Sequence, residues 1–418
     1  MQASASELHR ARQTRINDAI ALKVPDRVPV WLGDCGYFPA KYAGFTCEEA
    51  MFQSEKLFTA YTKTLADFAP DVYFGPGQSI RAPGGAFEIT ECKSLKLPGR
   101  GASAHHSHQA VELESMKAEE YDEFIDDPVE FAIRRFLPRI YGVMKPLEKL
   151  PPLHGLLMGY GGVMTSALFA QPEIARAFEA FYKAGRMIQA HQAASAAFTD
   201  RMTGAGLPQM FAVGAYAPFD VISDHLRGIR GTMTDMYRRP EKLLAAIEKL
   251  TPRIIASAIA AAKASGNPGV FIALHRGADG FMSVKQFETF YWPSLKKLLV
   301  ALVDAGLTPC PFFEGNYSSR LEHLADLPKG KILGMFDNTD PAKAKDVLAG
   351  IMCIAGMMPL SLLQFGTPDE VKAQAKTLID VVGKDGGFIM GPKSVLDEAK
   401  PELVKVWIDF TKEYGRYR

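Results

Sequence analysis

Short apolar segments alternate with longer amphipathic segments along most of this chain. Runs of four to six apolar residues predict buried strands, and apolar positions three or four residues apart predict helices. The regular part of this pattern begins near residue 208. Eight strands are predicted, at residues 28–33, 71–75, 210–214, 270–274, 310–313, 331–336, 351–354 and 387–390.

Helices are predicted between most of these strands. They cover residues 1–24, 48–69, much of 118–204, 240–264, 284–305, 318–326, 341–348, 368–382 and 398–414. Residues 77–110 are rich in Gly, Pro and Ser and are expected to form a loop. Repeated strand–helix units favour a parallel sheet with helices outside. Eight units predict an α/β protein with a closed (β/α)8 TIM-type barrel.

The barrel is expected to form one domain over residues 1–418. A helical extension precedes it, and residues 77–205 supply insertions and peripheral helices. We find no linker rich in Pro and Gly between two separate cores. No Gly-x-Gly-x-x-Gly motif follows the first strand, which weakens the case for a dinucleotide-binding fold.

Composition narrows the class of protein. The 48 Lys and Arg residues balance 47 Asp and Glu residues, giving a net charge of +1, so no nucleic-acid partner is expected. No apolar run reaches the roughly 18 residues of a membrane span. The first residues lack the apolar core of a secretory signal. The five cysteines form no Cys-x-x-Cys pair and fit a reducing compartment, so we expect a cytoplasmic enzyme.

Candidate site residues follow from the barrel, because TIM barrels place their active sites at the carboxyl ends of the strands. For catalysis we expect Glu314, His275, Asp34 and Tyr37. For substrate binding we expect Arg276, Arg100, Asp224 and Tyr216. Asp337 follows the sixth strand, and Cys353 lies within the seventh.

Each assignment has a structural alternative. A buried Glu314 needs a partner, and a salt bridge to Arg276 or Arg320 would serve as well as a ligand or acid–base role. Asp337 suits a helix cap, and Cys353 suits plain core packing. The His105–His108 cluster is expected at the surface, with Arg100 nearby as an anchor for a substrate carboxylate.

Several segments stand in the order found in a known family. They include Val-Pro-Val-Trp at 28–31, the stretch 217–228, Gly-Met-Met-Pro at 356–359, Gly-Thr-Pro-Asp-Glu-Val at 366–371, residues 385–390 and Lys-Pro-Glu at 400–402. Over roughly residues 20–418 the chain resembles the uroporphyrinogen decarboxylase superfamily. The resemblance implies a distorted (β/α)8 barrel. It also implies either decarboxylation of a porphyrinogen or zinc-dependent methyl transfer.

The chain differs from the haem-pathway decarboxylase in the segments that bind and convert the porphyrinogen in that enzyme. The family holds the porphyrinogen carboxylates with arginines in the first-strand segment, and residues 31–39 contain none. Where the family has Gly-His-Gly after the last strand, this chain has Met390-Gly-Pro392. The barrel mouth offers more acid than base, so a substrate with eight carboxylates is not expected.

The sequence resembles the zinc-dependent methyltransferase branch of the superfamily more closely. Its members hold zinc with a His-x-Cys pair after strand five and a cysteine after strand eight. Here Phe312 and Glu314 replace the pair, and Lys393 or Ser394 lies near the last cysteine position. A substitute set of His275, Glu314 and either Asp337 or Cys353 is chemically possible. One ion can bridge Glu314 and His275 only if they lie within about 8 Å of each other.

The leading hypothesis is therefore a methyltransferase or demethylase. It would move a methyl group from a small methoxylated or methylated substrate to cobalamin, which is either free or carried by a separate corrinoid protein. The alternative is a lyase, either a decarboxylase or a hydratase/dehydratase, using Asp34, His275 and Glu314 as acids and bases. A non-catalytic binding barrel fits poorly, because ionisable groups crowd one rim. A homodimer is possible.

Overall fold

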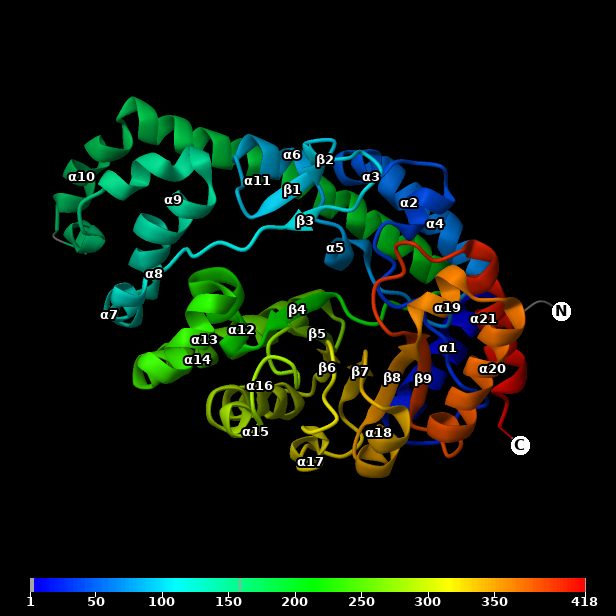
Figure 1. Ribbon diagram of the computed structural model, residues 1–418. Coiled ribbons are helices and arrows are strands. Elements are labelled where there is room, and N and C mark those ends of the chain that lie inside the picture. Colours follow the sequence, from blue (N-terminus) through cyan, green and yellow to red (C-terminus); the bar gives the residue numbers. More distant parts are fainter. Residues whose placement is uncertain (1–3, 158, 418) are drawn as a thin grey trace.

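A parallel sheet forms the centre of the protein. The computed structural model describes residues 4–157 and 159–417, and its main sheet contains six parallel strands in chain order (Figure 1). Each begins within three residues of a predicted strand start. They are β4 (Val213–Tyr216), β5 (Gly269–Leu274), β6 (Thr308–Phe313), β7 (Leu333–Phe336), β8 (Cys353–Met358) and β9 (Phe388–Pro392).

The other two predicted strands close the ring as isolated bridges. The three parallel bridges are Val30 to Met390, Trp31 to Val72 and Tyr73 to Gln209. The segment at 28–33 thus lies between β9 and the segment at 71–75, which in turn meets the chain just before β4. Eight segments close a barrel, and the prediction of a (β/α)8 fold is confirmed.

Helices cover the outside of the barrel. Those after β4 are α12 (Pro218–Asp220), a π-helical turn η5 (Val221–Arg227), α13 (Gly228–Arg238) and α14 (Pro240–Ser265). Later ones are α15 (Val284–Gln286), η6 (Phe287–Tyr291), α16 (Trp292–Asp304), α17 (Leu321–Leu324), α18 (Pro341–Leu348), α19 (Leu360–Phe365), α20 (Pro368–Leu378), η7 (Ile379–Gly383) and α21 (Pro401–Tyr414). The helices at 218–238 were not predicted, although Pro218 at the first helical position marks their start.

The N-terminal half supplies the extension and the insertions. Its helices are α1 (Ala5–Ile20), α2 (Phe38–Tyr42), α3 (Cys47–Phe52), α4 (Ser54–Phe68), α5 (Pro76–Ser79), α6 (Gly84–Ile89), η1 (Ala118–Glu120), α7 (Tyr121–Asp126), α8 (Pro128–Phe131), η2 (Ala132–Phe136), α9 (Leu137–Ile140), η3 (Gly142–Lys149), η4 (Leu153–Leu157), α10 (Gly161–Phe169) and α11 (Pro172–Gly204). The expected loop at 77–110 is wrong in part. It holds two short helices and a small sheet, β2 (Gly101–Ala102), β1 (Leu95–Pro98) and β3 (Gln109–Ala110).

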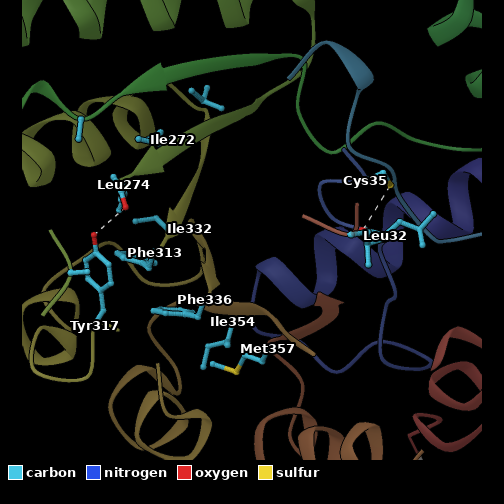
Figure 2. Packing of buried hydrophobic residues seen from close by; sticks show 14 of the residues in the cluster. Leu32, Cys35, Ile272, Leu274, Phe313, Tyr317, Ile332, Phe336, Ile354 and Met357 are labelled. Atoms are coloured by element: carbon cyan, nitrogen blue, oxygen red, sulfur yellow. Dashed lines mark hydrogen bonds between the residues drawn. The ribbon is translucent and has the colours of Figure 1, made fainter. Parts of the chain in front are cut away.

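Alternate residues of each strand face opposite sides of the barrel wall. Outward residues such as Leu274, Phe313 and Phe336 pack in the large core between strands and helices (Figure 2). A second apolar cluster takes members from all eight strand segments, including Phe271 and Phe312, and therefore fills the barrel interior. This alternation decides which side chains reach the mouth.

Helix α1 closes the opposite end of the barrel. Its Ile16 and Ala19 belong to the interior cluster, and Arg15 reaches the buried Asp71 at 2.7 Å. The functional end is thus the carboxyl ends of the strands, as expected for this fold. Among the described residues, no helix has both the length and the apolar character needed to cross a membrane. The division into a single domain stays a prediction.

Candidate active site at the barrel mouth

Strand alternation brings three predicted residues to the mouth. Phe271 and Phe312 face the barrel interior, so residues an even number of positions further on share that direction. His275 and Glu314 follow β5 and β6 in this register. Asp337 follows β7 in the same way, two residues after the inward Met335.

The centre of the site is a line of three side chains. Nδ1 of His275 lies 2.5 Å from Oδ2 of Asp224. On the other side of the ring, Nε2 of His275 lies 3.7 Å from Oε2 of Glu314. The prediction that His275 and Glu314 lie close enough to act together is confirmed. Because the carboxylate of Asp224 accepts the Nδ1 proton, Nε2 is the nitrogen available for chemistry.

Neighbouring charges shift the pKa values of the side chains in this line. Burial alone would lower the pKa of His275, but the hydrogen bond and charge of Asp224 outweigh burial and raise it. Burial alone would raise the pKa of Asp224, but His275 and Arg276 hold it below its usual range. Nη2 of Arg276 lies 2.9 Å from Oδ1 of Asp224, an attraction of opposite charges without hydrogen-bond alignment. The charge of Arg276 thus stabilises the ionised carboxylate of Asp224. The role of Arg276 in substrate binding stays a prediction.

Glu314 differs from its predicted environment. Its side chain is 50% exposed, so the expectation of a buried glutamate is wrong, and no salt bridge to Arg276 or Arg320 is formed among the described residues. The walls of the mouth still desolvate the carboxylate in part, which raises the pKa of Glu314, and nearby Asp337 adds to this effect. An exposed acid beside an imidazole can exchange a proton with a ligand in the mouth.

A buried carboxylate that sequence reasoning did not select supports the line. Asp220 is fully buried and accepts hydrogen bonds from the backbone N–H of His275 at 2.9 Å, from that of Arg276 at 3.2 Å and from the Tyr291 hydroxyl at 2.7 Å. It therefore fixes the turn that carries His275. Asp220 and Asp224 lie four residues apart around a helical turn, a spacing that would have indicated a shared face.

Asp337 has a structural role that was not expected. Its Oδ2 accepts from the backbone N–H of Gly315 at 3.0 Å and from the side-chain amide of Asn338 at 2.9 Å. Burial raises the pKa of Asp337. These bonds hold the turn after Glu314. The helix cap considered for Asp337 is instead Asp340, whose side chain accepts the Lys343 N–H. Asp337 lies beside Glu314 without completing a ligand set.

Asp34 and Tyr37 lie on the other wall of the mouth. The first strand segment is four places from β6 around the eight-membered ring, so it stands opposite Glu314. Oδ1 of Asp34 accepts from Gly36 N–H at 2.8 Å. The Tyr37 hydroxyl, whose pKa burial raises, lies 3.0 Å from Nδ1 of His108. Neither the bond from Gly36 nor the contact with His108 reaches the Asp224–His275–Glu314 line.

The histidine-rich segment lies at the surface as predicted, with His105 and His106 exposed, while Ser107 and His108 are partly buried against the mouth region. Besides the contact of His108 with Tyr37, the Ser107 hydroxyl donates to Asp397, which also accepts the Tyr37 N–H at 2.5 Å. The Cys47 thiol donates to the carbonyl of His105. These contacts fix the segment between the first strand and the loop after β9.

Arg100 and Tyr216, which were predicted to bind substrate, contact other side chains of the protein in the structure. The Arg100 guanidinium binds Glu48 at 2.6 Å and Glu88 at 2.8 Å, joining α3 to α6 on the surface, so its charge is already neutralised. Tyr216 ends β4 and is 39% exposed. Its ring meets that of His225 edge to face at 5.2 Å, which keeps Tyr216 at the rim near Asp224.

The prediction of Cys353 as a metal ligand at the mouth is wrong, because its side chain packs inside the barrel. It begins β8, and the strand register puts Phe313 level with Phe336 and Gly356, so Cys353 lies about 10 Å below that level. There it packs in the interior cluster near Cys310 and α1, where burial raises the pKa of its thiol. Within the described part of the chain, no three His, Cys, Asp or Glu side chains are arranged to hold one metal ion. The residues present thus do not fit the zinc site that the resemblance implied.

Comparison with known proteins concerns the fold and the family. No curated protein matches this sequence. Among solved structures, a methyltransferase from Methanosarcina mazei is similar with a TM-score of 0.62 and 16% identity, covering 96% of this chain and 98% of that one. A B12-independent methionine synthase from Shewanella sp. W3-18-1, in complex with selenomethionine, has a TM-score of 0.33 and 10% identity, covering 48% and 59%.

The first of these similarities shows a shared barrel architecture over nearly the whole chain. The family follows from the sequence itself. The family model described as uroporphyrinogen decarboxylase (URO-D) matches residues 188–414. The match spans more than half of the chain and includes the segments that carry Asp224, His275 and Glu314. This protein belongs to the uroporphyrinogen decarboxylase family.

Proposed function

We propose that this chain is a methyltransferase that removes a methyl group from a small methoxylated or methylated substrate and delivers it to a corrinoid. The observation that carries the proposal is the Asp224–His275–Glu314 line at the barrel mouth. The fold that it shares with a methyltransferase from Methanosarcina mazei supports the same class of reaction.

The line suits activation of the leaving group. A bound reduced corrinoid would supply the nucleophile for the methyl carbon. As the bond from that carbon to the substrate oxygen breaks, the oxygen needs a proton. Protonated His275 donates it from Nε2, and Asp224 holds the imidazolium on Nδ1. Glu314, 3.7 Å from Nε2, orients the substrate and returns a proton to the ring. General acid catalysis of this kind contributes roughly 10²–10⁴-fold.

Zinc has no step in this scheme, because the donor groups at the mouth do not form a zinc-binding set. Asp224 already occupies Nδ1 of His275, and Asp337 is engaged by Gly315 and Asn338. Activity should therefore survive treatment with a chelator. Loss of activity that added zinc restores would assign leaving-group activation to the metal instead.

A lyase is the second candidate. It is favoured by the same observation, since an imidazole and a carboxylate with raised pKa values can remove and return a proton during decarboxylation or dehydration. In that reaction no methylated corrinoid would form. The two functions thus differ in their products.

The test uses the intact chain with free cob(I)alamin and a panel of methoxylated aromatic acids and methylated amines and thiols. We expect a methylated corrinoid, followed by its visible spectrum, and a rate at least ~10²-fold lower for His275→Asn. His323→Asn is the matched control, because His323 also pairs with a carboxylate, Glu288 at 3.0 Å, but lies on α17. Release of carbon dioxide or water without methylated corrinoid would favour the lyase, and an unaffected rate in His275→Asn would refute both.

A further inference from the structure

Arg81 follows the second strand segment and carries a charge that no neighbour neutralises. Its side chain is exposed, and it forms no ion pair or hydrogen bond with another residue that the structure describes. The arginines that follow β5 and β6 differ in this respect. Arg276 lies 2.9 Å from Asp224, and Arg320 lies 3.3 Å from Asp279. The guanidinium of Arg81 is therefore available to a ligand.

The order of the strands places Arg81 between two walls of the mouth. The second strand segment, residues 71–75, pairs with the first strand segment on one side and with the chain just before β4 on the other. His108 contacts Tyr37 after the first segment, and His225 follows β4. Arg81 comes directly after α5, which leads from the second segment to the insertion (Figure 1). Because parallel strands finish at one end of the barrel, Arg81 lies at the mouth between the two histidines.

Electrostatics agree with this position. Burial lowers the pKa of His108, and the positive charge of Arg81 lowers it further. Burial also lowers the pKa of His225, and the charges of His275 and Arg81 add to this effect. Charges act on each other over about 10 Å at physiological ionic strength. Arg81 is thus within reach of both histidines, and His225 is in turn within reach of His275.

Tyr216 borders the space between Arg81 and His275. The register of β4 with β5 puts Tyr216 level with Ala273, which shares the inward direction of Phe271. The ring of Tyr216 therefore points into the mouth, where it is 39% exposed. A flat or apolar part of a ligand can pack against this ring.

The backbone that carries Arg81 is fixed, although its side chain is exposed. Ile80 is buried, and its N–H donates to the carbonyl of Pro76 at 3.0 Å. The N–H of Ala82 donates to the carbonyl of Ile80 at 2.8 Å. A charged group on a fixed backbone loses less conformational freedom when it binds a ligand.

We propose that Arg81 binds the carboxylate of the substrate, which is a small organic acid whose methylated or methoxylated end reaches His275. A guanidinium donates two parallel hydrogen bonds to a carboxylate, and the charges strengthen both. The middle of the acid lies against Tyr216. The position of the reacting end rests on the proposed function, whereas the contact between Arg81 and the carboxylate does not.

A second cation at the mouth fits this role less well. Lys393 follows β9, and its Nζ lies 3.4 Å from Oδ1 of Asn338. The charge of Lys393 acts on the neighbouring carboxylate of Asp337. An acid bound at Lys393 would meet that carboxylate, whereas Arg81 has no carboxylate partner among the described residues.

Calorimetric titration with unreactive probes tests the carboxylate contact without turnover. The intact native chain should bind benzoate at least ~10-fold more tightly than neutral benzamide. Arg81→Met should lose at least ~10-fold in benzoate affinity while its benzamide affinity and melting temperature stay native. Arg253→Met is the matched control, because Arg253 is exposed on the outer helix α14 and bonds only a backbone carbonyl there. It should bind both probes as the native chain does.

Four results would overturn the proposal. They are no benzoate binding by the native chain at millimolar concentration, equal binding of benzoate and benzamide, native benzoate affinity in Arg81→Met, and loss of that affinity in Lys393→Met alone. Inorganic phosphate that binds more tightly than benzoate and depends on Arg81 would assign the residue to a phosphorylated ligand instead.

Turnover separates this proposal from the proposed function. With para-methoxybenzoate and free cob(I)alamin, Arg81→Met should raise KM by at least ~10-fold and change kcat much less, because Arg81 does not touch the reacting oxygen. A lowered kcat with unchanged KM would contradict a binding role. If the native chain binds benzoate through Arg81 but forms no methylated corrinoid, the proposed function fails and the carboxylate contact stands.

Discussion

Asp220 offers the most direct test of how the site is built. This fully buried carboxylate holds the turn that carries His275 and Arg276 through three hydrogen bonds. The substitution Asp220→Asn keeps its shape. Two donors, the backbone N–H of His275 and the Tyr291 hydroxyl, share Oδ2, so the amide oxygen can still accept both. The amide nitrogen then faces the N–H of Arg276, and one donor is left unpaired.

The size of the effect follows from these contacts. A buried donor without a partner costs about 1–3 kcal/mol. The pKa of Asp220 is raised to about 7, first by burial and then by the charge of Asp224. The folded chain therefore holds the proton more tightly than the unfolded chain. This stabilisation is complete below the unfolded pKa of 3.8 and is lost as the pH rises through about 7.

Asp220→Asn has no such titration. The native protein should lose roughly 2–3 kcal/mol of stability from this group between pH 5 and 8, at ~1.4 kcal/mol for each unit of pKa difference. We expect Asp220→Asn to be less stable than the native protein by about 1–3 kcal/mol at pH 5. The difference should shrink or vanish at pH 8.

Urea unfolding from pH 5 to 8 measures both quantities without a substrate. Tyr291→Phe is the control, since it removes one hydrogen bond to Asp220 but keeps the carboxylate. Its stability should still fall over this pH range. If Asp220→Asn is destabilised equally at pH 5 and pH 8, Asp220 does not titrate as described. If it matches the native stability throughout, the three hydrogen bonds do not hold the turn.

Three further outcomes are expected. Glu314→Gln should lower kcat by ~10²-fold or more with the melting temperature unchanged, because its side chain is half exposed; unchanged turnover would remove Glu314 from the site. Asp224→Asn should lower the pKa of His275, because it removes the carboxylate that raises it; a histidine NMR titration with no shift would contradict the pairing. Arg100→Ala should leave KM unchanged, since Arg100 is already paired with Glu48 and Glu88; a raised KM would restore its predicted contact with substrate.

The fold could be predicted because its signals are local. Buried parallel strands read as short apolar runs, and each of the six sheet strands begins within three residues of its predicted start. Even the most specific segment of the family resemblance has a local meaning. Thr367 and Glu370 cap each other's backbone at the start of α20. That segment therefore reports on architecture and carries no information about the substrate.

The insertion was harder to predict because its structure depends on distant partners. The expected loop at 77–110 forms a small sheet whose strands have two to four residues. Segments so short lack a periodic signal of their own. The segment 221–227 was missed for a related reason. It is a π-helical turn, and its spacing differs from that of an α-helix.

The candidate site shows the same division between local and distant information. Strand ends predicted His275 and Glu314 together, because parallel strands finish at one edge of the barrel. The sequence did not show how far from the barrel mouth a residue within a strand would lie. Cys353 shares the inward direction of Ala355 on β8, but the register with β7 places it near the barrel floor. The two-residue difference between the predicted start at 351 and the observed start of β8 does not change this. A ligand for an ion at the mouth would have to lie after Gly356, and the side chains there are Met357 and Met358. Both side chains are fully buried in the large core between strands and helices, so at the level of His275 β8 contributes packing rather than a side chain for coordination of a metal.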